Sequence, residues 1–215
     1  MKKKLIIIPI VLLAVSISVM SLSASALSNP FKDVVKGKYY YDAVIELSSE
    51  GIMEGKSATV FGVKQDATRE ETAYYIAKAL DLDLTDIVDP GFKDVSKSSK
   101  YYPAIAKLSN LGVIQGDGKG NFLPKNKLQR YQVAILIVKA FELEKSASLH
   151  LAFTDVKSYS KSTQLEIQTL VDYKITAGTS KTAFSPKAYV KKEDLALFLK
   201  RSIDVYEAFD LVGIE

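Results

Sequence analysis

One tetrapeptide that recurs at nearly constant spacing constrains the fold of this chain more than any other feature. Phe-Lys/Thr-Asp-Val begins at Phe31, Phe92 and Phe153, so each copy starts 61 residues after the one before. Glycine, aromatic and basic positions downstream keep this register in the second copy, and in the third copy after one inserted residue, at a spacing of 62. Such a period is the signature of a repeated supersecondary unit. We therefore interpret the chain as three copies of one unit.

Each unit contains two helical patterns. In the first copy, apolar residues recur at the spacing of one helix face, at Tyr40, Ala43, Val44 and Leu47. Gly51 follows this helix, at a position where a left-handed C-terminal residue favours glycine. A second helix is predicted to begin at Thr68, because Thr68-Arg69-Glu70-Glu71 matches a capping box with Thr68 as N-cap and Glu71 three residues later.

The repeats are expected to pack together. A helix pair of about 50 residues buries its own apolar face poorly, and the joining segments, roughly residues 81–91 and 142–152, are short. The predicted fold is all-α, with three helix-loop-helix repeats packed as a pseudo-threefold helical bundle. An open solenoid is the alternative, which the absence of polar capping repeats disfavours.

The N-terminus has the features of a secretory signal peptide. Three lysines precede an apolar run of about 15 residues, Leu5 to Val19, and small residues then lead to Ala24-Ser25-Ala26. This order predicts cleavage after Ala26. An uncleaved anchor is the alternative, although a spanning helix needs about 20 residues. The predicted organisation is a signal peptide at 1–26, repeats at 27–88 and 89–149, and a third repeat with a C-terminal extension at 150–215.

Composition argues against several classes of function. The chain has 29 basic and 25 acidic residues, and removal of the signal peptide leaves 26 against 25. A nearly neutral chain lacks the basic field of nucleic-acid binders, so we expect neither nucleic acid nor, after cleavage, a membrane as partner. With no cysteine and with His150 as the single histidine, no thiol nucleophile or histidine-based triad can form. The carboxylates of Glu70 and Glu71 are adjacent on a helix and diverge, unlike a glycosidase pair. We expect no enzyme activity, cofactor or metal site.

The motifs of the repeat together resemble the S-layer homology domain. The resemblance rests on F-x-D-V, the aromatic-rich start of a helix, a loop that ends in Phe, and the residues Thr68-Arg69-Glu70-Glu71 that open the second helix, and it covers residues 29–203. The chain departs from the family by having no tryptophan, and by reading Gln129-Arg130 and Lys191-Lys192 in the later copies.

This resemblance implies a function and a place of action. Members of the family attach exported proteins non-covalently to secondary cell-wall polymers of Gram-positive bacteria. Their usual ligand carries pyruvylated amino sugars, and three repeats form a three-pronged bundle with binding grooves between neighbours. The resemblance therefore implies a secreted protein attached to the cell wall or S-layer through an anionic polysaccharide.

The basic residue at the start of each second helix is the main candidate for contact with that polysaccharide. A guanidinium makes paired hydrogen bonds to a carboxylate, and free N–H groups at a helix start also favour an anion. We expect the contributions to decrease in the order Arg69, Arg130, Lys192, because lysine lacks the planar fork. Pairing of these cations with acids across a repeat interface is the alternative.

Other candidates have equally plausible structural roles. Three aspartates could contact sugar hydroxyls or close turns, and the tyrosines could stack on sugars or belong to the core. Two loop glycines could admit a sugar close to the main chain or serve backbone conformation. These candidates are Asp33, Asp94, Asp155, Tyr40, Tyr41, Tyr101, Tyr102, Gly55 and Gly116. In the alternative function, an adaptor with degenerate grooves binds another protein, and the segment 202–215 packs on the bundle or contacts that partner.

Overall fold

The computed structural model describes residues 27–212, so the predicted signal peptide lies outside the described residues. This part of the chain contains helices and isolated β-bridges but no β-strand. The helices are α1 (Tyr41–Ser49), α2 (Arg69–Ala79), α3 (Tyr102–Asn110), α4 (Arg130–Ala140), the 3-10 helix η1 (Thr154–Val156), α5 (Lys161–Asp172) and α6 (Lys192–Val212).

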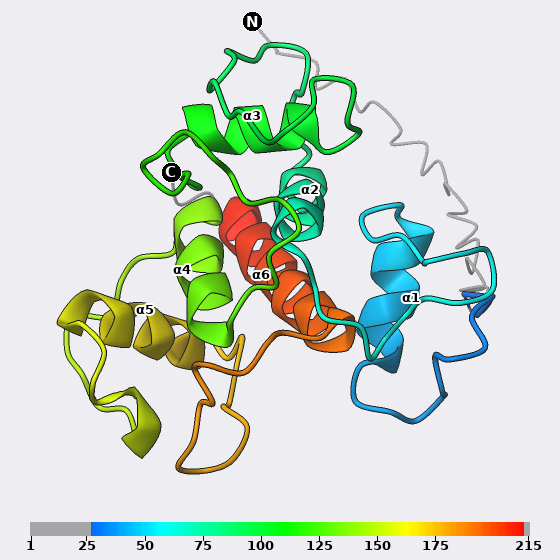
Figure 1. Ribbon diagram of the computed structural model, residues 1–215. Coiled ribbons are helices and arrows are strands. Elements are labelled where there is room, and N and C mark those ends of the chain that lie inside the picture. Colours follow the sequence, from blue (N-terminus) through cyan, green and yellow to red (C-terminus); the bar gives the residue numbers. More distant parts are fainter. Residues whose placement is uncertain (1–26, 213–215) are drawn as a thin grey trace, which may run out of the picture.

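The helices form a bundle with three prongs. In Figure 1, α2, α4 and α6 lie at the centre and α1, α3 and α5 lie around them. Each outer helix packs on the central helix of the preceding repeat: α3 on α2, α5 on α4, and α1 on α6. The third of these pairs joins the last repeat to the first, so the arrangement is cyclic. The predicted all-α fold of three repeats is confirmed, and the open solenoid is wrong.

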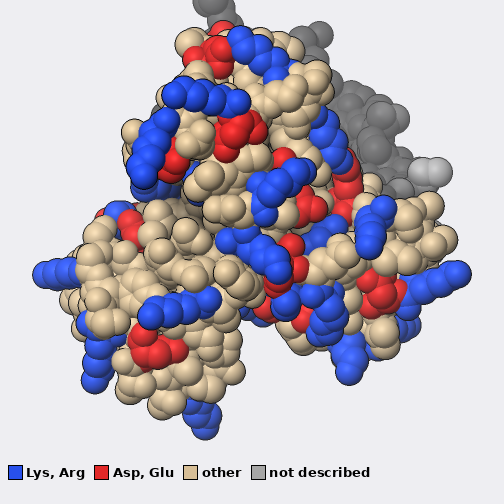
Figure 2. Space-filling view, viewed as in Figure 1, with Lys and Arg blue, Asp and Glu red and all other residues tan. Residues whose placement is uncertain are grey.

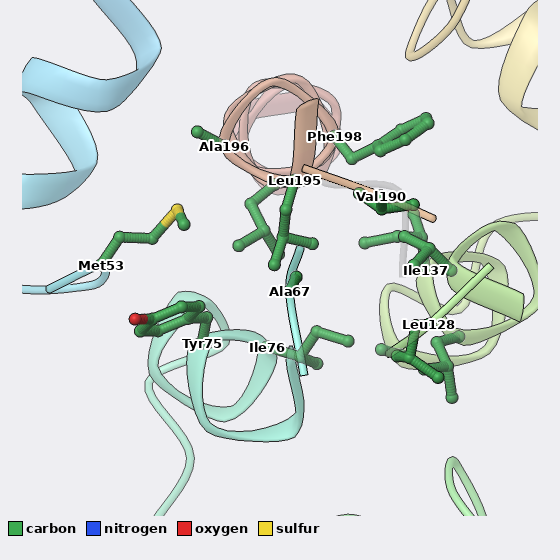
Figure 3. Close-up of a cluster of buried hydrophobic side chains, with 14 of the residues drawn as sticks. Met53, Ala67, Tyr75, Ile76, Leu128, Ile137, Val190, Leu195, Ala196 and Phe198 are labelled. Carbon is green, nitrogen blue, oxygen red and sulfur yellow. The ribbon is translucent and has the colours of Figure 1, made fainter. Parts of the chain in front are cut away.

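The core lies where the three central helices meet. Figure 3 shows side chains of α2, α4 and α6 converging, with Ile76, Ile137 and Leu195 all fully buried. A large apolar side chain contributes about 1.5–3 kcal/mol when it is removed from water. Because this centre draws on all three repeats, no repeat completes it alone.

A ring of three backbone hydrogen bonds marks the pseudo-threefold axis. The N–H of Ala67 donates to Val190 O (2.8 Å), that of Val190 to Leu128 O (2.9 Å), and that of Leu128 to Ala67 O (3.2 Å). These residues occupy equivalent positions just before the central helices, and all three are buried. The ring closes only when each repeat contributes one link.

Local signals in the sequence account for the helix ends. Thr68 caps α2, and Glu71 returns to the Thr68 N–H (3.0 Å), which confirms the predicted capping box. Gly51 and Gly112 follow α1 and α3 with φ of +70° and +71°, as predicted for glycine at this position. Lys174 takes the equivalent conformation after α5, with φ of +59°, which is unfavourable for a residue with a Cβ.

Candidate functional site

Three aspartates fasten the start of each repeat to its own loop. Asp33 accepts hydrogen bonds from the N–H groups of Phe61 (2.8 Å), Gly62 (2.7 Å) and Val63 (3.1 Å). Burial opposes ionisation of Asp33, but these N–H groups outweigh it and lower its pKa. The counterparts form the same clamp, Asp94 with Phe122 and Leu123, and Asp155 with Phe184 and Ser185.

The glycines of the candidate site lie against the phenylalanine of the same motif. A Cβ at Gly55 would stand 2.6 Å from Cε1 of Phe31, and one at Gly116 would stand 2.7 Å from Cε1 of Phe92. Real Cβ atoms do not approach so closely, so glycine is what lets each ring pack on its loop. The observed neighbour of these glycines is therefore an aromatic ring of the protein.

The three basic candidates link consecutive repeats. Arg69 donates from Nε to Phe122 O (2.9 Å) and from Nη2 to Gln115 O. Arg130 donates from Nε to Phe184 O (2.9 Å). Each guanidinium also lies over the ring of the phenylalanine whose carbonyl it binds, at 4.6 and 5.0 Å from the centroids.

Lys192 makes the corresponding link from the third repeat back to the first. Its Nζ donates to Glu54 O (2.8 Å) and Phe61 O (3.0 Å) and lies 4.5 Å from the centroid of the Phe61 ring. Burial lowers the pKa of Lys192, Arg130 and Arg69. All three cations thus serve the packing of the bundle, whatever else they bind.

The expectation of free N–H groups at these helix starts is wrong. The first two N–H groups of each central helix donate to carbonyl oxygens of the next repeat in the ring. The pairs are Arg69 with Asn126, Glu70 with Pro124, Arg130 with Ala188, Tyr131 with Pro186, Lys192 with Gln65, and Glu193 with Val63. Because the cyclic packing occupies these donors, an anion must be recognised by side chains.

A cavity of about 450 Å³ lies beside Arg130. Its wall includes Tyr39 from the first repeat, Arg130 from the second, and Asp194 and Arg201 of α6 with the loop 175–179 from the third. We call this cavity the Arg130 groove. The guanidinium of Arg130 commits its Nε–H to Phe184 O, and Nη1 stands 3.8 Å from Oδ2 of Asp194. Within residues 27–212 neither terminal nitrogen makes a hydrogen bond, so both can serve a ligand.

A cavity of about 230 Å³ beside Arg69 is built from the same positions one repeat earlier. We call it the Arg69 groove. Three positions of its wall correspond by register to positions of the Arg130 groove. Gln115 corresponds to Ala177, Gln132 to Asp194, and Lys139 to Arg201. The two cavities therefore differ in charge, because an acid in one is an amide in the other. Arg69, Gln115 and Gln132 also line a second cavity of about 190 Å³, so the open space beside Arg69 is similar in volume to that beside Arg130.

The candidate tyrosines divide between core and surface. Tyr40 is buried, whereas Tyr41, Tyr101 and Tyr102 are half-buried. Tyr101 packs edge-on against the ring of Tyr74, at 5.6 Å between centroids.

Tyr39 belongs to the aromatic-rich helix start identified in the sequence, but the candidate site residues did not include it. Tyr39 lines the Arg130 groove, is 61% exposed, and donates to Oε1 of Glu193 (2.9 Å) and Oδ1 of Asp194 (3.1 Å). Burial and these two acids raise the pKa of its hydroxyl. Arg201 and Lys139 were also missed, although a basic residue follows each candidate cation nine positions later, at Lys78, Lys139 and Arg201.

Charges of both signs are interspersed over the face in Figure 2, so no field of a single sign covers this face. Along residues 27–212, none of the helices combines the length and apolar character needed to cross a membrane. The extension of α6 packs on the bundle, with Tyr206 against Phe141 and Phe209 against Tyr173, at 6.3 and 5.9 Å between ring centroids.

Comparison with known proteins places the repeats in a family. The family model of the S-layer homology domain matches residues 30–73, 91–134 and 152–196, once in each repeat. An S-layer protein of Bacillus licheniformis is 30% identical over 179 residues, which cover 81% of this chain and 20% of that protein. A surface-layer 125 kDa protein of Lysinibacillus sphaericus is 30% identical over 198 residues, covering 90% and 16%.

An endoglucanase of Bacillus sp. (strain KSM-635) is 28% identical over 171 residues, covering 78% of this chain and 18% of that protein. The chain therefore spans about a fifth of the length of these relatives or less.

Proposed function

Because the chain belongs to the S-layer homology domain family, we propose that it anchors a protein to the bacterial cell wall by binding an anionic secondary cell-wall polysaccharide. The proposed ligand is a pyruvylated amino sugar, and the proposed sites are the Arg130 and Arg69 grooves. We place the protein outside the cell, on the wall, and assign it no catalytic step.

The observation that carries this proposal is the guanidinium of Arg130 on the wall of a cavity of about 450 Å³. Its Nε–H is committed to Phe184 O, so the side chain is already held in place. The terminal N–H groups form a planar fork that suits a carboxylate, which is the group that a pyruvate ketal adds to a sugar. Arg201 brings a second positive charge to the same cavity, and Thr176 and Thr179 bring hydroxyls for sugar oxygens.

The names of the relatives agree with a role in anchoring. S-layer proteins and an endoglucanase share this region as about a fifth of their length. A shared region in proteins with different names supports a common attachment role and gives no support to an activity of this region itself.

The test is sedimentation of the chain, expressed from Leu27, with purified cell-wall sacculi before and after chemical removal of pyruvate. We expect binding to be lost with the pyruvate. Equal binding by both preparations would contradict the carboxylate mechanism.

Arg130→Lys and Arg69→Lys test the sites with little risk to folding, since Lys192 already fills the third equivalent position. A lysine keeps the link to the phenylalanine carbonyl and loses the terminal fork. Loss of a charged hydrogen bond costs about 1.5–3 kcal/mol, so each groove should bind at least about tenfold more weakly. Lys187→Gln, an exposed charge change outside the grooves, is the control. Unchanged binding by the folded double variant would refute the assignment.

A further inference from the structure

The site that corresponds by register to the Arg130 and Arg69 grooves at the third repeat interface contains a carboxylate of the protein. Its position follows from the register, in which Glu54 takes the place that Gln115 has in the Arg69 groove and Ala177 in the Arg130 groove. We call the site around Lys192 and Glu54 the Lys192 groove. Among these three loop positions, only Glu54 carries an acid.

The Glu54 carboxylate is bound by side chains from two repeats. Its Oε2 accepts a hydrogen bond from Nζ of Lys100 (2.6 Å), and its Oε1 accepts one from the hydroxyl of Tyr74 (3.1 Å). Nζ of Lys78 stands 3.9 Å from Oε1. The hydrogen bond from Lys100 and the neighbouring charges lower the pKa of Glu54, so the group is ionised at neutral pH.

The main chain of Glu54 is bound as well. Its carbonyl oxygen accepts hydrogen bonds from Nζ of Lys192 (2.8 Å) and from the hydroxyl of Tyr75 (3.3 Å). The loop that carries the acid is therefore fixed to both α6 and α2, and the carboxylate is held at one place.

The groups around Glu54 are the counterparts of residues that border the cavity in the Arg130 groove. By register, Lys192 replaces Arg130, Lys100 replaces Tyr39, Lys78 replaces Arg201, and Tyr74 and Tyr75 replace Leu197 and Phe198. Around Arg130 these positions border open space of about 450 Å³. Around Glu54, Lys100, Tyr74 and Lys78 lie at the carboxylate, whereas Lys192 and Tyr75 bind the carbonyl oxygen of the same residue.

We propose that Glu54 is an internal anion that occupies the Lys192 groove and excludes an external carboxylate, so that two of the three grooves take the glycan. This inference rests on the proposed function for the identity of the ligand. The cations that would attract a pyruvylated sugar to the third groove, Lys100 and Lys78, are paired with Glu54. The site is thus built for an anion and holds one from its own chain.

The test is a calorimetric titration of the wild type and Glu54→Gln with an amino-sugar glycoside that carries a pyruvate ketal. Glutamine has nearly the same shape, removes the charge, and is the natural residue of the Arg69 groove. We expect the variant to bind one more equivalent than the wild type. Glu54→Ala, which copies the Arg130 groove, should gain the same equivalent. Glu50→Gln, an exposed change outside the groove, should gain none.

The number of equivalents bound by the wild type tests the proposed function, and the difference between variant and wild type tests this inference. A folded Glu54→Gln with the wild-type number of sites would overturn the role of Glu54, as would a wild type that already binds three. Far-UV circular dichroism establishes that the variants are folded.

Discussion

Replacement of Lys192 by methionine tests whether the bundle is closed by the link from the third repeat to the first. Lys192 is 3% exposed, and its ammonium donates to the carbonyl oxygens of Glu54 and Phe61. Methionine has nearly the same volume but no donor, so Phe61 O loses the lysine and Glu54 O keeps only the hydroxyl of Tyr75. A hydrogen bond to a charged group contributes about 1.5–3 kcal/mol, and the relief of burying an ammonium offsets part of the loss.

We expect Lys192→Met to reduce the free energy of unfolding by about 3 kcal/mol. For a chain of this size, that loss corresponds to a decrease in Tm of about 6–12 °C. Because the chain has no tryptophan, urea unfolding is followed by circular dichroism at 222 nm. The exposed Lys187→Met is the control.

A second variant tests whether stability depends on the hydrogen bonds at position 192 or on lysine itself. Lys192→Arg should lie within about 1 kcal/mol of the wild type, since Arg69 makes both equivalent contacts in its own repeat. If Lys192→Met loses less than about 0.5 kcal/mol with an unchanged dependence on urea, the link does not stabilise the closed ring and the reasoning fails.

Two further predictions concern single positions. Lys174→Gly should stabilise the protein by about 0.5–1 kcal/mol in the same urea assay, because φ of +59° suits glycine and both Gly51 and Gly112 already have this conformation; a loss of stability would contradict it. Asp33→Asn should cost about 1–3 kcal/mol at pH 7, because an amide nitrogen cannot accept from the N–H groups of Gly62 and Val63. Since the folded-state pKa of Asp33 is lowered, its contribution is present above the unfolded pKa and is lost as pH falls through the folded one. Wild-type stability should therefore decrease as the pH falls below about 4, and the variant's curve should be flatter there.

The sequence was sufficient for the repeats, their helices and the all-α fold. These depend on signals that lie close together along the chain, such as the apolar face of α1 and the box formed by Thr68 and Glu71. Because the repeats share one register, a role predicted for a residue in one repeat also applies to the equivalent residue in the next. The equivalent glycines and cations were therefore predicted as sets.

The sequence did not predict which residues of neighbouring repeats contact one another. The register shows that Arg69, Arg130 and Lys192 are equivalent, but not that each reaches the loop of the next repeat. For Lys192 that loop lies 131 residues away, and Tyr39 meets Glu193 at a separation of 154 residues. Periodicity carries no information at such distances. The same packing pairs the N–H groups at each helix start with carbonyl oxygens of the next repeat. The sequence of one isolated helix does not predict these partners.

Cyclic closure uses the same three cations that the sequence predicts for ligand contact, and the number of donors left after closure differs among them. Arg130 commits its Nε–H, Arg69 commits Nε–H and an N–H of Nη2, and Lys192 commits two of the three N–H groups of its ammonium. The order of remaining donors is therefore Arg130, Arg69, Lys192, and the groove that we propose to be filled by Glu54 has the cation with the fewest. Lys192 retains the fewest donors after closure, so the proposed loss of its groove as a binding site removes little capacity for an external anion.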